Sequence, residues 1–160
     1  MNDIKLESKN YIFKYRVSGA MIVNNKLLTV QIMDNGFYCL PGGHVISKET
    51  SSEAIKREME EEVNCKVEVA NMFAVAENIF KRADETTVQE LGMYYFIKPD
   101  KQMSLDNKTI IEENDGIKKK LEFKWIALDD LDKENFKPKF LIEQLKKQDS
   151  NLKYYSFKQN

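Results

Sequence analysis

The sequence is poor in the residues on which small secreted proteins and zinc proteins depend. It has two cysteines, Cys39 and Cys65, and a single histidine, His44. Two cysteines do not make a disulfide framework, and without a CxxC pair or a second histidine they do not make a zinc site. We therefore expect two free thiols and a reducing, cytoplasmic setting.

Long apolar runs and an excess of one charge are also missing. No apolar stretch approaches the ~20 residues of a membrane span. The first ten residues, MNDIKLESKN, have no apolar core of the kind found in signal peptides. The net charge is −1, which gives no electrostatic reason to expect a nucleic-acid polymer or an acidic membrane as partner. A small anion bound through a metal ion remains compatible with this composition.

The composition indicates one globular domain over residues 1–160, because apolar residues make up 42% and charged residues 32% of the chain. The order of its predicted strands and helices indicates an α/β (α+β) fold. Aromatic and β-branched runs predict five strands, at 11–23, 26–33, 66–79, 88–97 and 121–127. Helices are predicted from Thr50 and over 139–147, after Pro138. The order indicates a mixed sheet with helices on its faces. Residues 80–87 and 100–120 are predicted as loops, and the tail 148–160 has no assignment.

The stretch 42–65 is typical of a loop, a helix and a second loop. Gly42 and Gly43 carry no Cβ, so the backbone there can approach a bound ion closely. Thr50 followed by Glu53 matches a capping box at a helix start. The helix would bury an apolar stripe made of Ala54, Ile55, Met59 and Val63.

Three glutamates of this helix, Glu58, Glu61 and Glu62, stand at positions i, i+3 and i+4. That spacing places their carboxylates on one face, about one turn apart, where like charges repel. One interpretation is a solvated helix face balanced by Lys56 and Arg57. The other is a Mg²⁺ site, because Mg²⁺ prefers oxygen ligands and is usually held by one or two carboxylates together with substrate phosphates.

The spacing of these residues resembles the Nudix box, the metal-binding signature of the Nudix hydrolases. Gly43, Glu49 and the run from Arg57 to Glu62 all fall at the expected positions of a pattern that ends at Cys65. One departure is Asn64, where the family pattern has glycine. Asparagine is the next best residue for a left-handed helix exit, so the helix end is expected to be kept.

The resemblance implies an α/β/α sandwich with a mixed central sheet and a Mg²⁺-dependent hydrolase of diphosphate linkages, with Mn²⁺ as a possible substitute. In that reading Arg57 and Glu49 pair to hold the acids in place. The implied metal ligands are three carboxylates and a backbone carbonyl, from Glu58, Glu61, Glu62 and Gly43. The partner would be a small nucleotide or nucleoside diphosphate substrate, bound by a monomer or a homodimer.

Residues outside the box are candidates for substrate binding. The resemblance implies that Arg16 or Gln31, on the first strands, meets the substrate phosphates; exposed strand residues are the alternative. Phe37 and Tyr38 precede the box and would stack on a base, or else belong to the core. His44 is at best a phosphate contact, since no orienting partner is evident. The general base is a box glutamate or one of the acids outside it, Glu112, Glu113 or Glu122.

The absence of two sequence markers narrows the range of possible substrates. No proline lies between Pro41 and Pro99, and no tyrosine between Tyr38 and Tyr94, so the markers of the ADP-ribose and diadenosine-polyphosphate subgroups are missing. What remains is a MutT-like hydrolase of a nucleoside triphosphate or other nucleoside diphosphate derivative. The alternative from another class is a Nudix-fold sensor or interaction module that binds nucleotide without cleaving it.

Overall fold

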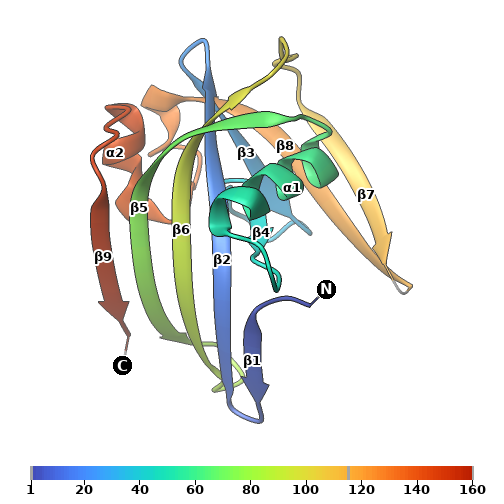
Figure 1. Ribbon diagram of the computed structural model, residues 1–160, viewed down its shortest axis with the longest axis vertical. Helices are drawn as coiled ribbons and strands as arrows, with labels where there is room; N and C mark the ends of the chain where they lie inside the picture. The colour runs from blue at the N-terminus through green and yellow to red at the C-terminus, as the bar shows by residue number, and fades with distance from the viewer. Residues whose placement is uncertain (1, 115, 160) are drawn as a thin grey trace.

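The computed structural model describes residues 2–114 and 116–159. A mixed β-sheet forms its centre, with helices packed on both faces (Figure 1). The helices are α1 (Ser51–Val63) and α2 (Ile142–Lys146), with short 3-10 turns η1 (Leu128–Asp130) and η2 (Lys139–Leu141). The strands are β1 (Lys5–Ser8), β2 (Tyr11–Val23), β3 (Lys26–Ile32), β4 (Gly42–His44), β5 (Val67–Lys81), β6 (Thr87–Pro99), β7 (Lys108–Asn114), β8 (Ile117–Ala127) and β9 (Lys153–Lys158).

The sheet is split beside β2, and this split positions the box loop. The strand order is β7-β8-β3-β2-β6-β5-β9. The strands β2 and β3 pair only next to their tight turn, at 22–23 against 26–27. Closer to the start of β2, the short strand β4 pairs with residues 16–18 instead. The Gly42–Gly43 loop is therefore held by backbone hydrogen bonds to the centre of the sheet.

Helix α1 forms as the sequence predicts, because both of its ends are capped. The Thr50 hydroxyl accepts the backbone N–H of Glu53, and the Glu53 carboxylate accepts the backbone N–H of Thr50 at 2.7 Å. Asn64 ends the helix in the left-handed region, with φ 53°. Ala54, Ile55 and Met59 are fully buried against the sheet.

Each face of the sheet has its own apolar core. The core beneath α1 includes Ile55, Met59 and Trp125. The core on the opposite face includes Phe73, Phe136 and Leu145, and the segment from η1 to α2 covers it. The predicted α/β/α sandwich with a mixed central sheet is confirmed. Among the described residues, no helix is long and apolar enough to cross a membrane.

The prediction that residues 100–120 form a loop is wrong for most of that range. Residues 108–114 are β7, and β8 begins at Ile117 instead of Leu121. This hairpin lies at the sheet edge and is largely exposed, so it lacks the apolar alternation by which strands are usually recognised. Opposite charges pair across it instead: Glu112 lies opposite Lys119, and Glu113 opposite Lys118.

Three smaller expectations also need correction. The strand ending at Ala127 is not the last, because β9 in the tail pairs in parallel with β5. The predicted loop 80–87 is shorter, since β5 runs to Lys81 and β6 begins at Thr87. The helix predicted over 139–147 is a 3-10 turn followed by α2. β9 is exposed at the edge and its aromatic residues pack sideways on Phe140, so its sequence shows no buried face.

Candidate active site

Arg57 connects the box loop to helix α1. Its guanidinium makes five hydrogen bonds, which matches its number of N–H donors. Two go to the Glu49 carboxylate, at 3.1 and 2.8 Å. The others reach the Glu58 and Glu61 carboxylates at 2.8 and 3.2 Å and the His44 carbonyl at 3.1 Å. The hydrogen bonds to Arg57 hold the pKa of Glu49 below its usual value, so this pair is ionised and fixed in place.

Gly43 is needed because Glu58 occupies the space that a side chain would fill. A Cβ at position 43 would lie 2.4 Å from the Glu58 carboxyl carbon and one of its oxygens. The Glu58 side chain is 12% exposed. Its burial raises its pKa, while the hydrogen bond from Arg57 opposes that rise. The loop and the carboxylate are therefore packed directly on each other.

The two other glutamates of the face differ sharply in burial. The side chain of Glu62 is 12% exposed, and that of Glu61 is 61% exposed. Burial raises the pKa of Glu62 to about 7. The positive charge of Lys119 lowers this pKa, and the negative charges of Glu58 and Glu112 raise it. The Lys119 ammonium is 3.8 Å from the Glu62 carboxylate. A charged Glu62 is thus only partly compensated by the protein itself, and an additional cation beside it would be favourable.

These groups line one hollow of about 830 Å³, which we call the acidic cleft. Its lining consists mainly of charged side chains around the box loop: Asp3, Arg16, Ile32, Gly42, Gly43, His44, Arg57, Glu58, Glu61, Glu62, Glu112, Glu113 and Lys119. Within the described part of the chain, no three His, Cys, Asp or Glu side chains are arranged to hold a metal ion unaided. The donor set nevertheless fits Mg²⁺, which usually takes only one or two carboxylates and completes its shell with water and phosphate oxygens.

The β7–β8 hairpin supplies the far wall of the acidic cleft. Glu112, Glu113 and Lys119 all line it. Glu122, the third acid suggested as a base, does not; its carboxylate pairs with Lys120 at 2.8 Å outside the cleft. Of the three acids outside the box that the sequence suggests as a base, Glu112 and Glu113 therefore line the acidic cleft.

Sequence reasoning missed Asp3. The segment around it lies along the box loop, with a β-bridge from Asp3 to Ile46, and its carboxylate lies 3.5 Å from His44 Nδ1. His44 therefore has the orienting partner that was not evident from sequence. Burial is the main cause that lowers the His44 pKa, so its imidazole is neutral at pH 7. No local pattern around residue 3 indicates this contact, which depends on the pairing of β1 with β2.

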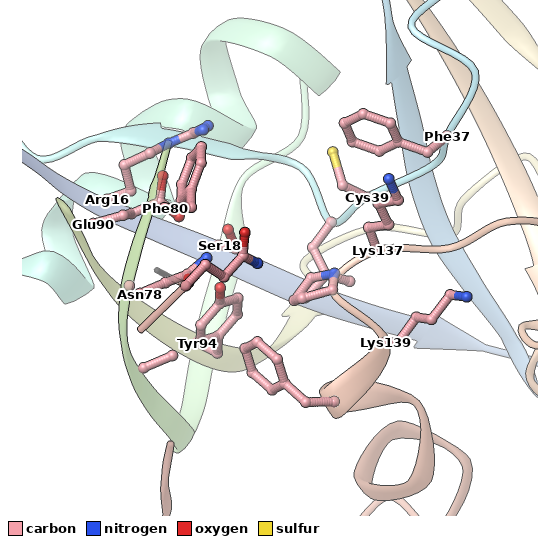
Figure 2. A pocket seen from close by; sticks show the side chains of 16 residues that line it. Arg16, Ser18, Phe37, Cys39, Asn78, Phe80, Glu90, Tyr94, Lys137 and Lys139 are labelled. Carbon is pink, nitrogen blue, oxygen red and sulfur yellow. The ribbon is translucent and has the colours of Figure 1, made fainter. Parts of the chain in front are cut away.

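Arg16 also lines a second hollow, of about 550 Å³, which we call the aromatic pocket (Figure 2). Arg16 is the residue that lines both hollows. The lining comes from β2, β5, β6 and three connecting segments: Arg16, Ser18, Phe37, Cys39, Leu40, Ala76, Asn78, Phe80, Glu90, Gly92, Tyr94, Lys137, Pro138, Lys139, Phe140 and Gln159. An aromatic, half-polar hollow beside an acidic one suits a ligand with a flat ring at one end and phosphates at the other.

The four residues predicted to bind substrate are divided by the structure. Arg16 and Phe37 line the aromatic pocket, and the Lys137 ammonium lies 4.8 Å from the Phe37 ring centroid. Tyr38 and Gln31 line neither hollow. Tyr38 packs against the core under Lys124, and Gln31 lies opposite Glu122 in β8. Residues adjacent in sequence, Phe37 and Tyr38, thus point to different environments, as alternation in an extended segment requires.

Comparison with known proteins is consistent with this arrangement. A family model described as the NUDIX domain matches residues 14–145. A search among curated proteins returns no match. The fold resembles a mutator MutT protein from Bacillus halodurans, with a TM-score of 0.65 at 15% identity over 91% of this chain and 90% of that one.

Two further solved structures share the fold. A UDP-X diphosphatase aligns with a TM-score of 0.59 at 20% identity, over 89% of this chain and 66% of that one. An ADP-ribose pyrophosphatase from Streptococcus suis aligns with a TM-score of 0.57 at 18% identity, over 89% and 98% of the two chains. The chain spans only about two thirds of the UDP-X diphosphatase. The domain match covers most of the sequence and includes the whole box. The chain therefore belongs to the Nudix family of hydrolases.

Proposed function

We propose that the protein hydrolyses a diphosphate linkage in a nucleoside triphosphate or another nucleoside diphosphate derivative, with Mg²⁺ as cofactor and Mn²⁺ as a possible substitute. The observation that carries this proposal is the junction of the two hollows at Arg16. A nucleoside in the aromatic pocket would place its phosphates in the acidic cleft. The MutT and ADP-ribose pyrophosphatase folds named above support this class of substrate.

The box residues would hold the metal and fix its surroundings. Glu58, Glu61, Glu62 and the Gly43 carbonyl would provide its protein ligands. The Glu62 side chain is as buried as that of Glu58, each being 12% exposed, and no hydrogen bond from the described residues occupies its carboxylate. Arg57 and Glu49 would keep Glu58 and the loop in position. A bound Mg²⁺ supplies neutralisation of phosphate charge and lowers the pKa of a coordinated water.

Side chains outside the box would complete the reaction space. Arg16 would donate hydrogen bonds to a phosphate oxygen, because its Nε is buried without a partner among the described residues and it borders both hollows. Lys119 would place positive charge near the phosphates. Glu112 or Glu113 would accept the proton of the attacking water, since both face the acidic cleft.

The test is a panel of nucleoside triphosphates, nucleotide sugars, dinucleotides and CoA, incubated with Mg²⁺ or Mn²⁺ and resolved by ion-pair chromatography. A triphosphate substrate should give the monophosphate and pyrophosphate. Turnover should stop in EDTA and return when Mg²⁺ is added in excess. Metal-independent turnover would contradict the proposal, and tight binding without any turnover would favour the alternative, a Nudix-fold sensor.

Three wider expectations belong to this proposal. We expect residues 1–160 to act as one domain, as a monomer or a homodimer. We also expect a cytoplasmic protein, because its two cysteines make no disulfide framework. The net charge of −1 gives no reason to expect a nucleic-acid polymer or a membrane as partner. Size-exclusion chromatography with light scattering would determine the oligomeric state.

A further inference from the structure

The aromatic pocket contains a polar pair that the phosphate chemistry does not use. Asn78 on β5 and Glu90 on β6 are directly opposite each other in the antiparallel pairing, and both line the pocket. Directly opposed residues on one face have Cβ atoms roughly 5 Å apart. Their polar ends are therefore close enough to contact one flat ligand together. Figure 2 shows both side chains reaching into the same hollow, on the Arg16 side.

Among the described residues, neither side chain is held by a hydrogen bond or a close ion pair. The Asn78 Oδ1 atom is buried and has no hydrogen-bond partner among the described residues. Glu90 has two cations nearby, Lys14 directly opposite on β2 and Arg16 two residues further along. Within the described chain, however, no ion pair of 4 Å or less joins Glu90 to either. Glu90 is also the one carboxylate among the residues that line this pocket. Unused polar groups beside a hollow indicate a ligand contact.

The pocket around this pair is shaped for a planar ring. Gly92 lies opposite Ala76 between the same two strands, and the Tyr94 ring lies over Gly92, 3.0 Å from where a Cβ would be, so Ala76 and an aromatic ring form the floor next to the pair. Phe80 lies on the other side of the pair from Tyr94, and Phe37 lies across the hollow (Figure 2). Phe140 meets Tyr94 edge to face, with 6.3 Å between the ring centroids. A nucleobase fits such a slot, because aromatic side chains stack on its faces and polar groups meet its edge.

The chemistry of the pair restricts which base would fit. An ionised carboxylate only accepts hydrogen bonds, whereas an asparagine amide both donates and accepts. Two adjacent N–H donors are needed to satisfy the two carboxylate oxygens at once. Among the common bases, guanine alone carries adjacent donors on its pairing edge, N1–H and the 2-amino group, and the second hydrogen of that amino group is left for the unpaired Asn78 Oδ1. Adenine would place the lone pair of its N1 against the carboxylate.

We propose that Glu90 and Asn78 make the aromatic pocket selective for guanine, with Glu90 accepting from N1–H and one hydrogen of the 2-amino group and Asn78 Oδ1 accepting from the other hydrogen of that group. This selectivity rests on the proposed function for the position of the phosphates, but the base contact itself needs no catalysis. It therefore makes a prediction for simple binding as well as for turnover.

The experiment measures binding of GMP, IMP, AMP and UMP by titration calorimetry, alongside kcat/KM for the matching triphosphates. IMP differs from GMP only by loss of the 2-amino group. We expect GMP to bind at least ~10-fold tighter than IMP, because a site built around a hydrogen bond rejects the analogue that lacks it. AMP and UMP should bind more weakly still. Equal affinity for GMP, IMP and AMP would overturn the assignment.

Two variants test the named residues. Glu90→Gln keeps the size of the side chain but replaces one acceptor by a donor, and it should reduce GMP affinity at least ~10-fold with little change for UMP. Asn78→Leu should weaken GMP more than IMP, because IMP lacks the 2-amino group from which Asn78 Oδ1 would accept. The matched control is Glu68→Gln, on β5 but exposed and outside the pocket, which should leave all four affinities unchanged. A guanine preference that survives Glu90→Gln would refute the role of Glu90.

The outcomes also separate this inference from the proposed function. Guanine-selective binding without hydrolysis of any nucleotide would support the pocket assignment and contradict the hydrolase proposal. Hydrolysis of all four triphosphates with equal kcat/KM would support the hydrolase and overturn the guanine assignment. Circular dichroism and thermal unfolding of each variant would establish that a lost affinity does not reflect a lost fold.

Discussion

The acidic cleft and the aromatic pocket share Arg16 but are built in opposite ways. Most of the acidic cleft comes from one continuous stretch, residues 42–62, with additions from the β7–β8 hairpin and Asp3. The aromatic pocket takes its lining from positions between Arg16 and Gln159 that are scattered over three strands and three connecting segments. One hollow is encoded locally, and the other exists only once the sheet has formed.

This difference separates the chemistry from the choice of substrate. Metal and phosphate chemistry needs carboxylates at a fixed spacing along a helix. A short sequence pattern is enough to specify that spacing. Recognition of the ring needs a slot whose walls come from distant strands, so it can change at single positions without disturbing the box. Changes in the acidic cleft should therefore affect turnover, and changes in the aromatic pocket should affect which substrate is bound.

The largest expected effect comes from Glu62→Gln, which removes one charge from the acidic cleft and keeps the side-chain size. We expect kcat to fall at least ~10²-fold, equivalent to about 2.7 kcal/mol, because a carboxylate that holds the metal stabilises charge in the transition state. Binding of a nucleoside monophosphate in the aromatic pocket should change little. Steady-state kinetics and calorimetry on the same preparation measure the two quantities.

The control for that prediction is Glu60→Gln on the same helix. Glu60 is exposed and outside both hollows, roughly 100° around the helix from its neighbours. Its substitution should leave kcat within about twofold. Glu61→Gln should resemble Glu62→Gln, despite the greater exposure of Glu61. If Glu60→Gln proved as damaging as Glu62→Gln, the assignment of the acidic face to metal binding would be wrong.

The same contrast explains how much was predictable from the sequence. Helix α1, its capping box and the Asn64 exit follow from local rules, and so does the spacing of the glutamates. The sheet and the helical layers could be predicted from apolar patterns. The β7–β8 hairpin could not, because it is a largely exposed edge held by pairs such as Glu112 and Lys119. Asp3 and Glu90 lie beside the site only through strand pairing, which no single segment specifies.

The next effect concerns the stability of the metal-free protein. Burial raises the pKa of Glu62 to about 7 in the folded chain, from an ordinary 4.5. Between these values the folded state holds a proton that the unfolded state has lost, so the unfolding free energy should fall as the pH rises from 5 to 8. The contribution should be on the order of 3 kcal/mol, since the pKa rises by roughly 2.5 units and one unit corresponds to about 1.4 kcal/mol. Urea unfolding in EDTA at several pH values measures it.

Two comparisons isolate the contribution of Glu62 to that slope. Glu62→Gln should flatten the dependence on pH, and Glu60→Gln should not. Excess Mg²⁺ should restore stability to the wild-type protein at pH 8, because an ion beside the carboxylate favours its charged form. Identical slopes for the wild type and Glu62→Gln would show that Glu62 is solvated in the metal-free protein, contrary to its burial here.

A smaller loss is expected from Gly43→Ala, which tests how tightly the loop and helix of the acidic cleft are packed. The added Cβ would lie 2.4 Å from the Glu58 carboxyl group, so that side chain must move. We expect turnover to drop about 10-fold, equivalent to ~1.4 kcal/mol in the barrier, with the helix content unchanged. The combined variant Gly43→Ala with Glu58→Gln should lose little more than Glu58→Gln alone. If the losses of turnover in the two single variants were additive, Gly43 would affect turnover by a route that does not involve Glu58.

The smallest effect concerns Asn64, where the chain departs from the glycine of the Nudix box. Its φ of 53° lies in the left-handed region. Asn64→Ala should lower the unfolding free energy by about 1 kcal/mol, because a Cβ without a local hydrogen-bonding group is unfavourable there. Asn64→Gly should stay within a few tenths of a kcal/mol of the wild type. Both variants should keep kcat and nucleotide affinity, since Asn64 lines neither hollow. A selective loss of turnover in Asn64→Gly would mean that this asparagine takes part in the chemistry rather than in ending the helix.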